Sequence, residues 1–149
     1  MPNACASLLM FSAALQVVDQ LYQNAAAWVE TSTIKSSPCK QLGLPNSNGQ
    51  WYDRWVVLTP WCLFVFEAEG SWAAPVCSIP LQAAELIDNP RLLPAGAPPG
   101  SIEGPGRIGV AYPLGFAVLS FGSAELAGAW CEEVSKALKE SQAAMEKAA

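Results

Sequence analysis

The sequence predicts a mainly β domain that is closed by a C-terminal helix and preceded by a long N-terminal helix. Between residues 39 and 121, short runs of strand-forming residues alternate with turn residues. On both sides of this region, apolar residues recur at spacings of three and four, which is typical of amphipathic helices. Hydrophobic residues make up 52% of the 149 residues and charged residues only 14%, so one domain with a substantial core is expected.

Residues 3 to about 31 are predicted to form one amphipathic helix with two neighbouring apolar rows. One row is expected to pack on the chain's own domain and the other on a protein partner; burial of both rows within the chain is the alternative. No apolar run in this segment reaches the length needed to span a membrane. The first basic residue is Lys35, which argues against a signal or transit peptide. The second-row residues expected to contact a partner are Met10, Val17, Leu21 and Trp28.

A Ser/Pro-rich connector at residues 31–38 is expected to separate this helix from the strands. The Asn-Gly pair within residues 45–50 predicts a turn after the first strand, and the proline-rich residues 89–106 predict a long loop before the last two strands. Pro80 restricts its strand to an edge or a bend, because proline lacks the N–H that a central strand donates. The predicted strands span residues 39–44, 51–58, 61–68, 75–81, 84–88, 107–112 and 115–121.

A C-terminal helix is predicted from residue 124 to 144, with Ser123 as its N-cap and Glu125 favourably placed in its first turn. Trp130 is expected to fill the open end of the β structure and to bury about 200 Å². The residues expected to line the apolar face of the helix are Leu126, Trp130, Val134 and Leu138. The resulting division is an N-terminal helix over residues 1–34, a β domain over 35–142 and a helical or frayed tail over 143–149.

Marker residues follow one another through these elements in a characteristic order. They are Lys40 in the first strand, Trp51, Arg54, Trp55 and Leu58 in the second, Leu63 to Phe66 in the third, Ile79 and Leu81 after it, and Trp130 in the helix. In this order and spacing the chain resembles a pleckstrin homology (PH) domain over roughly residues 38–140. The resemblance implies a seven-stranded β-sandwich or barrel whose open corner is filled by a large apolar side chain of the final helix. The N-terminal helix would be an addition to this PH-like domain.

The resemblance also implies a ligand, because the best-known PH activity is recognition of inositol phosphates by a basic cup. It assigns Lys40 and Arg54 as candidate lipid-binding residues. A compact phosphate needs several converging cations, whereas Tyr52 and Asp53 stand where basic side chains are favoured and the loop at residues 41–50 carries no charge. Phosphoinositide binding is therefore disfavoured, and Lys40 and Arg54 are expected to make structural hydrogen bonds or an ion pair with Asp53 or a nearby glutamate.

Several chemistries are excluded because the chain has no histidine. Ser-His-Asp and Cys-His catalysis and most zinc sites need an imidazole. No carboxylate pair or activated lysine stands out, so we expect no catalytic residue, no metal site and no cofactor, and an enzyme is the weakest class of function. A net charge of −5 argues against nucleic acid as a partner.

The five cysteines are scattered and include no C-x-x-C pair. This pattern predicts buried, reduced thiols in an intracellular reducing compartment, with a cytoplasmic or cytoskeletal location favoured. Cys5 is a candidate acylation site because it lies near the N-terminus. However, Pro2 occupies the position where N-myristoylation requires glycine, so the combination of two lipid anchors is incomplete.

The favoured function is a non-catalytic protein–protein interaction module, or a structural scaffold subunit of a larger complex. This hypothesis depends on the low charged fraction, on the wide apolar surface of the first helix, and on Trp72 and Tyr112 as further aromatic anchors for a partner. The alternative is a membrane-recruitment module that binds a phosphoinositide or another anionic lipid, aided by acylation at Cys5.

Overall fold

The computed structural model describes residues 25–43, 50–87, 102 and 105–148, which form an antiparallel sheet with helices on both of its faces. The strands are β1 (Lys35–Leu42), β2 (Trp51–Leu58), β3 (Cys62–Phe66), β4 (Cys77–Pro80), β5 (Glu85–Ile87), β6 (Arg107–Tyr112) and β7 (Gly115–Ser120). The helices are α2 (Ala25–Ser32), the short 3-10 helix η1 (Leu81–Ala83) and α3 (Ala124–Ala148).

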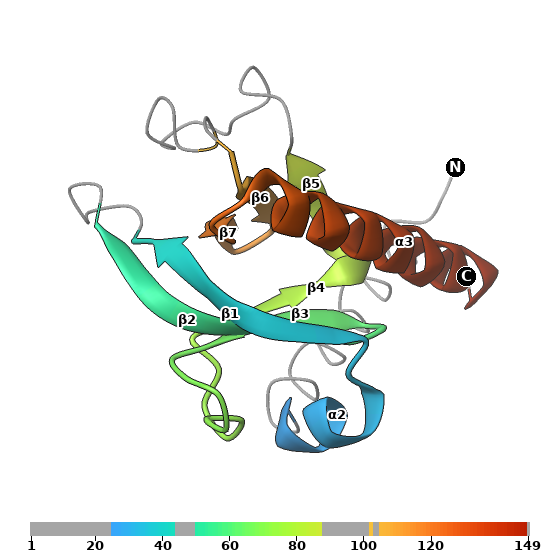
Figure 1. Cartoon of the computed structure of the whole chain (residues 1–149). Helices are drawn as coiled ribbons and strands as arrows, with labels where there is room; N and C mark the ends of the chain where they lie inside the picture. The colour runs from blue at the N-terminus through green and yellow to red at the C-terminus, as the bar shows by residue number, and fades with distance from the viewer. Residues whose placement is uncertain (1–24, 44–49, 88–101, 103–104, 149) are drawn as a thin grey trace.

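The strand order in this sheet is β4-β3-β2-β1-β7-β6-β5, with every neighbouring pair antiparallel. β4 and β5 end the sheet, so it is bent and open rather than closed into a barrel. Figure 1 shows the two resulting layers, β1–β4 and β5–β7, with α3 packed across their open end and α2 on the outer side of the first layer. This arrangement confirms the predicted seven-stranded fold with a C-terminal helix.

The first strand starts earlier than predicted, because β1 begins at Lys35. The expected connector at residues 31–38 is therefore wrong over its second half, where the chain already pairs with β2. Serine and proline have low strand propensity, but pairing with an apolar neighbouring strand overrides it. β1 pairs with β7 only at Lys40 and Gln41, so Pro38 lies where β1 has a partly open edge and a missing N–H is tolerated.

The turn between β2 and β3 is held by the buried side chain of Thr59. Its hydroxyl donates a hydrogen bond to the Cys62 carbonyl at 2.9 Å and accepts one from the Cys62 amide at 3.1 Å. Pro60 follows, with a backbone φ that suits a turn. The buried hydroxyl thus both donates and accepts a hydrogen bond, and the turn fixes β2 and β3 as neighbouring strands.

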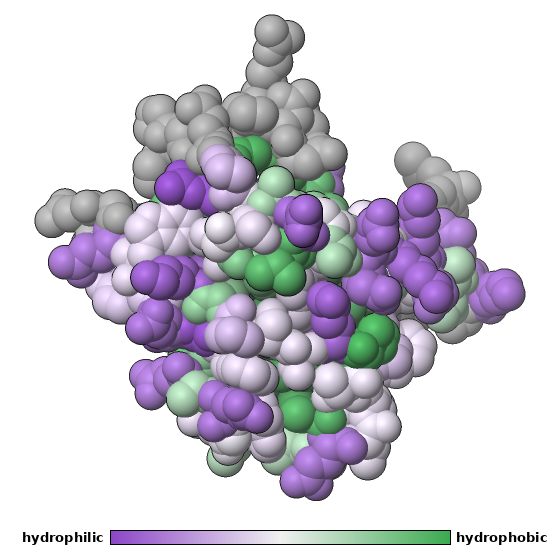
Figure 2. All heavy atoms as spheres, viewed as in Figure 1, coloured by the Kyte–Doolittle hydropathy of each residue, from purple (hydrophilic) through white to green (hydrophobic). Residues whose placement is uncertain are grey.

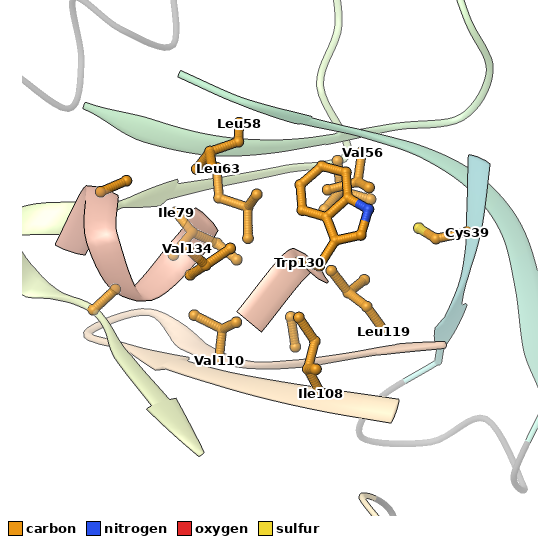
Figure 3. Close-up of a cluster of buried hydrophobic side chains, with 14 of the residues drawn as sticks. Cys39, Val56, Leu58, Leu63, Ile79, Ile108, Val110, Leu119, Trp130 and Val134 are labelled. Carbon is orange, nitrogen blue, oxygen red and sulfur yellow. The ribbon is translucent and has the colours of Figure 1, made fainter. Parts of the chain in front are cut away.

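The main core lies between the two layers and is organised around Trp130 of α3. Trp130 is 1% exposed, and its ring stacks on Phe121 with the centroids 5.2 Å apart. Its indole N–H donates a hydrogen bond to Ser37 Oγ at 3.1 Å. Figure 3 shows the ring pointing between the layers toward Val56 and Leu119. The expectation that Trp130 fills the open corner is confirmed.

A second apolar cluster covers the outer face of the first layer, beneath α2. Ala25 and Val29 of the helix pack with four buried residues of β2 and β3, namely Val57, Cys62, Phe64 and Phe66. The Thr33 hydroxyl donates to the Val29 carbonyl and thereby satisfies one of the last four carbonyls of α2. α2 coincides with the end of the predicted N-terminal helix, while residues 1–24 of that prediction lie outside the described residues.

Helix α3 follows the prediction at its start and differs from it in one apolar position and at its end. The Leu126 amide donates to Ser123 Oγ at 3.2 Å, so Ser123 is the N-cap as predicted. Leu126 itself is 54% exposed, and the buried position in its turn is Ala127. The helix continues to residue 148 instead of ending near 144, so the tail at 143–149 is helical over its described part.

Replacing Trp130 with alanine should lower the free energy of unfolding by about 3–5 kcal/mol, because the cavity would lie at the centre of the main core. Urea denaturation followed by far-UV circular dichroism measures this loss. Ser37→Ala isolates the indole hydrogen bond and should cost only about 1 kcal/mol. A Trp130→Ala variant that unfolds within about 1 kcal/mol of the parent chain would show that this side chain does not organise the core.

Candidate functional site

The two cations assigned to a lipid cup lie on opposite faces of the sheet. In the β1–β2 register, Lys40 is opposite Asp53 and Cys39 is opposite Arg54. Directly opposed residues share a face, and successive residues along a strand alternate between faces. Cys39 is buried in the core between the layers, so Arg54 lies on the inner face and Lys40 and Asp53 lie on the outer face. Lys40 and Arg54 therefore do not converge on one site.

Arg54 is held by its own surroundings at the rim of the inner face. Its Nε donates to Gln41 Oε1 at 3.2 Å, and its Nη1 donates to the Asp53 carbonyl at 3.1 Å. The guanidinium carbon lies 5.3 Å from the centroid of the Tyr52 ring, within cation–π range. Arg54 thus makes the structural hydrogen bonds expected from the sequence, with the carbonyl of Asp53 rather than its carboxylate as acceptor.

The outer face carries a different charged row, which crosses four strands. Lys40 of β1 lies between Asp53 of β2 and Ser120 of β7, and Ser120 is in turn opposite Arg107 of β6. The Arg107 guanidinium carbon lies 4.8 Å from the centroid of the Trp51 ring. Lys40 and Arg107 therefore flank the Ser120 hydroxyl. The one carboxylate of this row, that of Asp53, lies beside the exposed Lys40.

This row was not predicted from the sequence. Arg107 is half-buried and packs over Trp51. The two residues come from strands that are far apart in the sequence, and only the pairing of β1 with β7 brings them together. No local pattern predicts that pairing, so the sequence offers no signal for the row.

The aromatic residues predicted to anchor a partner make contacts within the chain. Trp28 and Trp72 are half-buried against the cluster beneath α2, and Trp72 meets Phe66 edge to face at 4.8 Å between centroids. The Tyr112 hydroxyl lies 3.1 Å from Cys77 Sγ, within hydrogen-bond range. These contacts account for part of each side chain and leave the rest accessible. The other anchor candidates, Met10, Val17 and Leu21, lie outside the described residues, as does Cys5.

Three of the described cysteines are shielded from reaction. Burial raises the pKa of Cys39 to about 12, and burial also raises the pKa of Cys62 and of Cys77 above the usual value. Because the thiolate is the reactive form, these thiols are poor nucleophiles. The Tyr112 hydroxyl also has a raised pKa, first through burial and then through its hydrogen bond with Cys77. Cys131 is half-buried and lies beside a surface groove.

That groove, of about 480 Å³, runs between α3 and the edge strand β5. Figure 2 shows that hydrophilic residues gather over the C-terminal half of α3. The groove is lined by Leu86, Cys131, Glu132, Ser135, Lys136 and Lys139.

In the described part of the chain, no group of three or more His, Cys, Asp and Glu side chains could hold a metal ion. Over the same residues, no helix is both long and apolar enough to cross a membrane.

Solved structures with a similar fold are PH domains. The solution structure of a pleckstrin homology domain matches with a TM-score of 0.56 at 18% identity, covering 74% of this chain and 88% of that one. The PH domain of the human KIAA0053 protein matches with a TM-score of 0.55 at 14% identity, covering 73% and 91%. A Slm1-PH domain in complex with phosphoserine matches with a TM-score of 0.54 at 15% identity, covering 72% and 96%.

The chain therefore has the PH-like fold that the sequence resemblance implied. No family model matches the chain. No curated protein sequence matches it either.

Stability should fall as the pH rises above about 9, because the unfolded chain then releases thiol protons that the folded chain retains. Below that pH both states are protonated at Cys39 and its contribution is complete. Between about 9 and about 12 its contribution declines, by at most about 1.4 kcal/mol per pH unit. Urea unfolding at a series of pH values measures the slope. Cys39→Ala should make the slope shallower without abolishing it, because the raised pKa values of Cys62 and Cys77 also contribute. The matched core variant Val56→Ala should lower stability and keep the slope; equal slopes in the two variants would contradict the assignment.

Proposed function

We propose that this PH-like chain is a non-catalytic binding module whose ligand is a protein, and that it acts as an interaction domain or scaffold subunit of a larger complex. The observation that carries the proposal is the separation of Lys40 and Arg54 onto opposite faces of the sheet. The basic cup known from lipid-binding PH domains needs converging cations, and Arg54 is the one cation of the assigned pair on the inner face. Free, buried thiols fit an intracellular reducing compartment for this module.

Electrostatics supports a protein ligand over a polyanion. Each charge-assisted contact to phosphate uses a donor that points at the ligand, but two of Arg54's nitrogens already donate to Gln41 and to the Asp53 carbonyl. Tyr52, on the same strand face as Arg54, contributes a ring and no charge. With a net charge of −5, long-range attraction to an anionic surface is also missing.

The proposed partner surface is the second apolar row of the N-terminal segment, continued by the accessible part of Trp28. α2 packs its Ala25 and Val29 side on the sheet, which leaves the other side of the helix for a partner. Large exposed aliphatic side chains, Ile34 among them, add apolar area elsewhere on the surface. Charged residues are scarce in this chain, which suits a surface that is covered in an assembly.

Charge placed in the second apolar row should abolish complex formation without affecting the fold. The test variant is Val17→Asp with Leu21→Asp, and the matched control is Gln16→Asp with Gln20→Asp on the polar side of the same predicted helix. Size-exclusion chromatography with light scattering, on the chain purified from its native source, measures the mass of the complex. We expect the test variant to elute near 15.8 kDa and the control to stay in the complex. A parent chain that elutes as a monomer without any partner would contradict the proposal.

One observation favours a second function, the binding of an anionic lipid headgroup on the outer face. Lys40 and Arg107 flank the Ser120 hydroxyl there, and the Trp51 ring orients the guanidinium of Arg107. A Slm1-PH structure with a TM-score of 0.54 describes ligand binding in a non-canonical site. The site is weaker than a basic cup, because Asp53 lies opposite Lys40. Acylation at Cys5 would supply the remaining membrane affinity.

Vesicle co-sedimentation separates the two faces. Phosphatidylcholine vesicles with phosphatidylinositol 4-phosphate should retain no more of the parent chain than phosphatidylcholine alone. Gln41→Lys with Tyr52→Lys would add two cations on the face of Arg54, and this variant should gain binding to the phosphoinositide vesicles. Binding by the parent chain would overturn the protein-ligand proposal. Loss of that binding in Lys40→Ala with Arg107→Ala, but not in Arg54→Ala, would then assign the outer face.

A further inference from the structure

We infer that the groove between β5 and α3 binds a short extended peptide in which an apolar side chain lies close to an acidic one. This inference deepens the proposed function and rests on it, because it assigns a second contact surface and a chemical class to the protein partner. Three features of the described residues carry it: the shape of the groove, the open edge of β5 and the charge of the groove wall.

The groove exists because the side of α3 that faces β5 carries small residues. Trp130, Val134 and Leu138 direct one side of the helix into the main core. The adjacent row contains Cys131 and Ser135, which are too small to fill the space beside Leu86 of β5. At one end the helix is fixed to the chain by Gln142, whose Nε2 donates to the Ala84 carbonyl at 3.3 Å. The groove is thus a consequence of the orientation of α3, which directs its large apolar residues into the core and its small residues toward β5.

The open edge of β5 favours an extended occupant. β5 ends the sheet and pairs with β6 on one side, and no strand of the described residues pairs with its other side. An edge strand offers free backbone N–H and C=O groups to another extended chain. The lining residues from Cys131 to Lys139 cover about 12 Å of helix, which is the length of about four extended residues.

The chemistry of the lining selects the side chains of the peptide. Leu86 and Cys131 give an apolar floor for one side chain, since both pack against the main core. Lys136 and Lys139 line the wall, and neither lysine makes a hydrogen bond or ion pair with a described residue. Glu132 is the one acidic lining residue, so the lining carries a net positive charge although the chain as a whole is acidic. A carboxylate on the peptide fits this wall.

Two pools of capped peptides of about seven residues test the inference. The first pool has a fixed Phe and, two positions later, a fixed Glu, with the other positions degenerate; the second has Lys in place of Glu. The full chain is immobilised, and retained peptides are quantified by mass spectrometry. We expect the Glu pool to be retained about tenfold more than the Lys pool. Equal retention, or no retention of either pool, would overturn the inference.

Variants assign the binding to the groove. Lys136→Glu with Lys139→Glu should remove the preference for the Glu pool and change the fold little, because both lysines are exposed. Lys147→Glu is the matched control, since it reverses an exposed lysine of the same helix outside the groove lining, and it should keep the preference. Ser135→Trp should fill the groove and abolish retention of both pools. Unchanged retention in Ser135→Trp would place the peptides elsewhere and refute the inference.

Alkylation of Cys131 gives a readout that is independent of retention. In a Cys5→Ser background, iodoacetamide should react first with Cys131, because Cys39, Cys62 and Cys77 are shielded by burial. Excess Glu-pool peptide should slow this reaction severalfold, and the Lys pool should not. If Cys131 is slow to react without peptide and the peptides change nothing, another part of the chain fills the groove and the inference fails.

The result can be separated from the test of the proposed function. A complex that depends on Val17 and Leu21, together with no peptide retention, refutes the groove alone. Peptide retention that depends on Lys136 and Lys139, in a chain that forms no complex through the N-terminal row, supports the groove and moves the partner surface to it. Loss of both results refutes both proposals.

Discussion

The contact of Trp130 with both layers of the sheet is the interaction on which the rest of the structure depends. An open sheet has no hydrogen bonds between its end strands, so β4 and β5 must be held together by side chains. The main core does this, because Ile79 of β4 and Leu86 of β5 pack in the same cluster as Trp130. The Trp130 ring stacks on Phe121, just after β7, and its N–H donates a hydrogen bond to Ser37 of β1. Lys35 adds a cation above the same ring at 5.5 Å. One residue of the last helix thereby fixes the first strand and the end of the last one.

The packing of Trp130 also determines which surfaces of the chain stay open. Once Trp130, Val134 and Leu138 face the core, the neighbouring row of α3 must face β5, and its small side chains leave a groove there. On the outer side of the first layer, α2 covers the apolar residues of β2 and β3. The surfaces that remain for partners are therefore set by the same constraint that stabilises the core.

Much of the fold follows from local patterns, whereas the geometry of the candidate sites does not. β2 matches its predicted range, because alternating strand formers lie between two clear turns. The role of Trp130 follows from its place on the apolar face of a capped helix. The orientation of Lys40 and Arg54 depends on strand register, and a shift of one residue moves a side chain to the other face. A motif that lists a lysine and an arginine in order contains no information about that shift.

Strand register thus links the fold of this chain to its ligand. Gln41, and not Lys40, shares the inner face with Arg54, and its amide accepts a hydrogen bond from that arginine. The cation that could have completed a cup instead faces outward opposite Asp53, where its charge is partly balanced. The outward orientation of Lys40 leaves the PH-like fold intact, because the core residues between the layers do not contact this side chain. The fold alone therefore does not determine the ligand. The ligand depends on the face of the sheet on which each charged side chain lies.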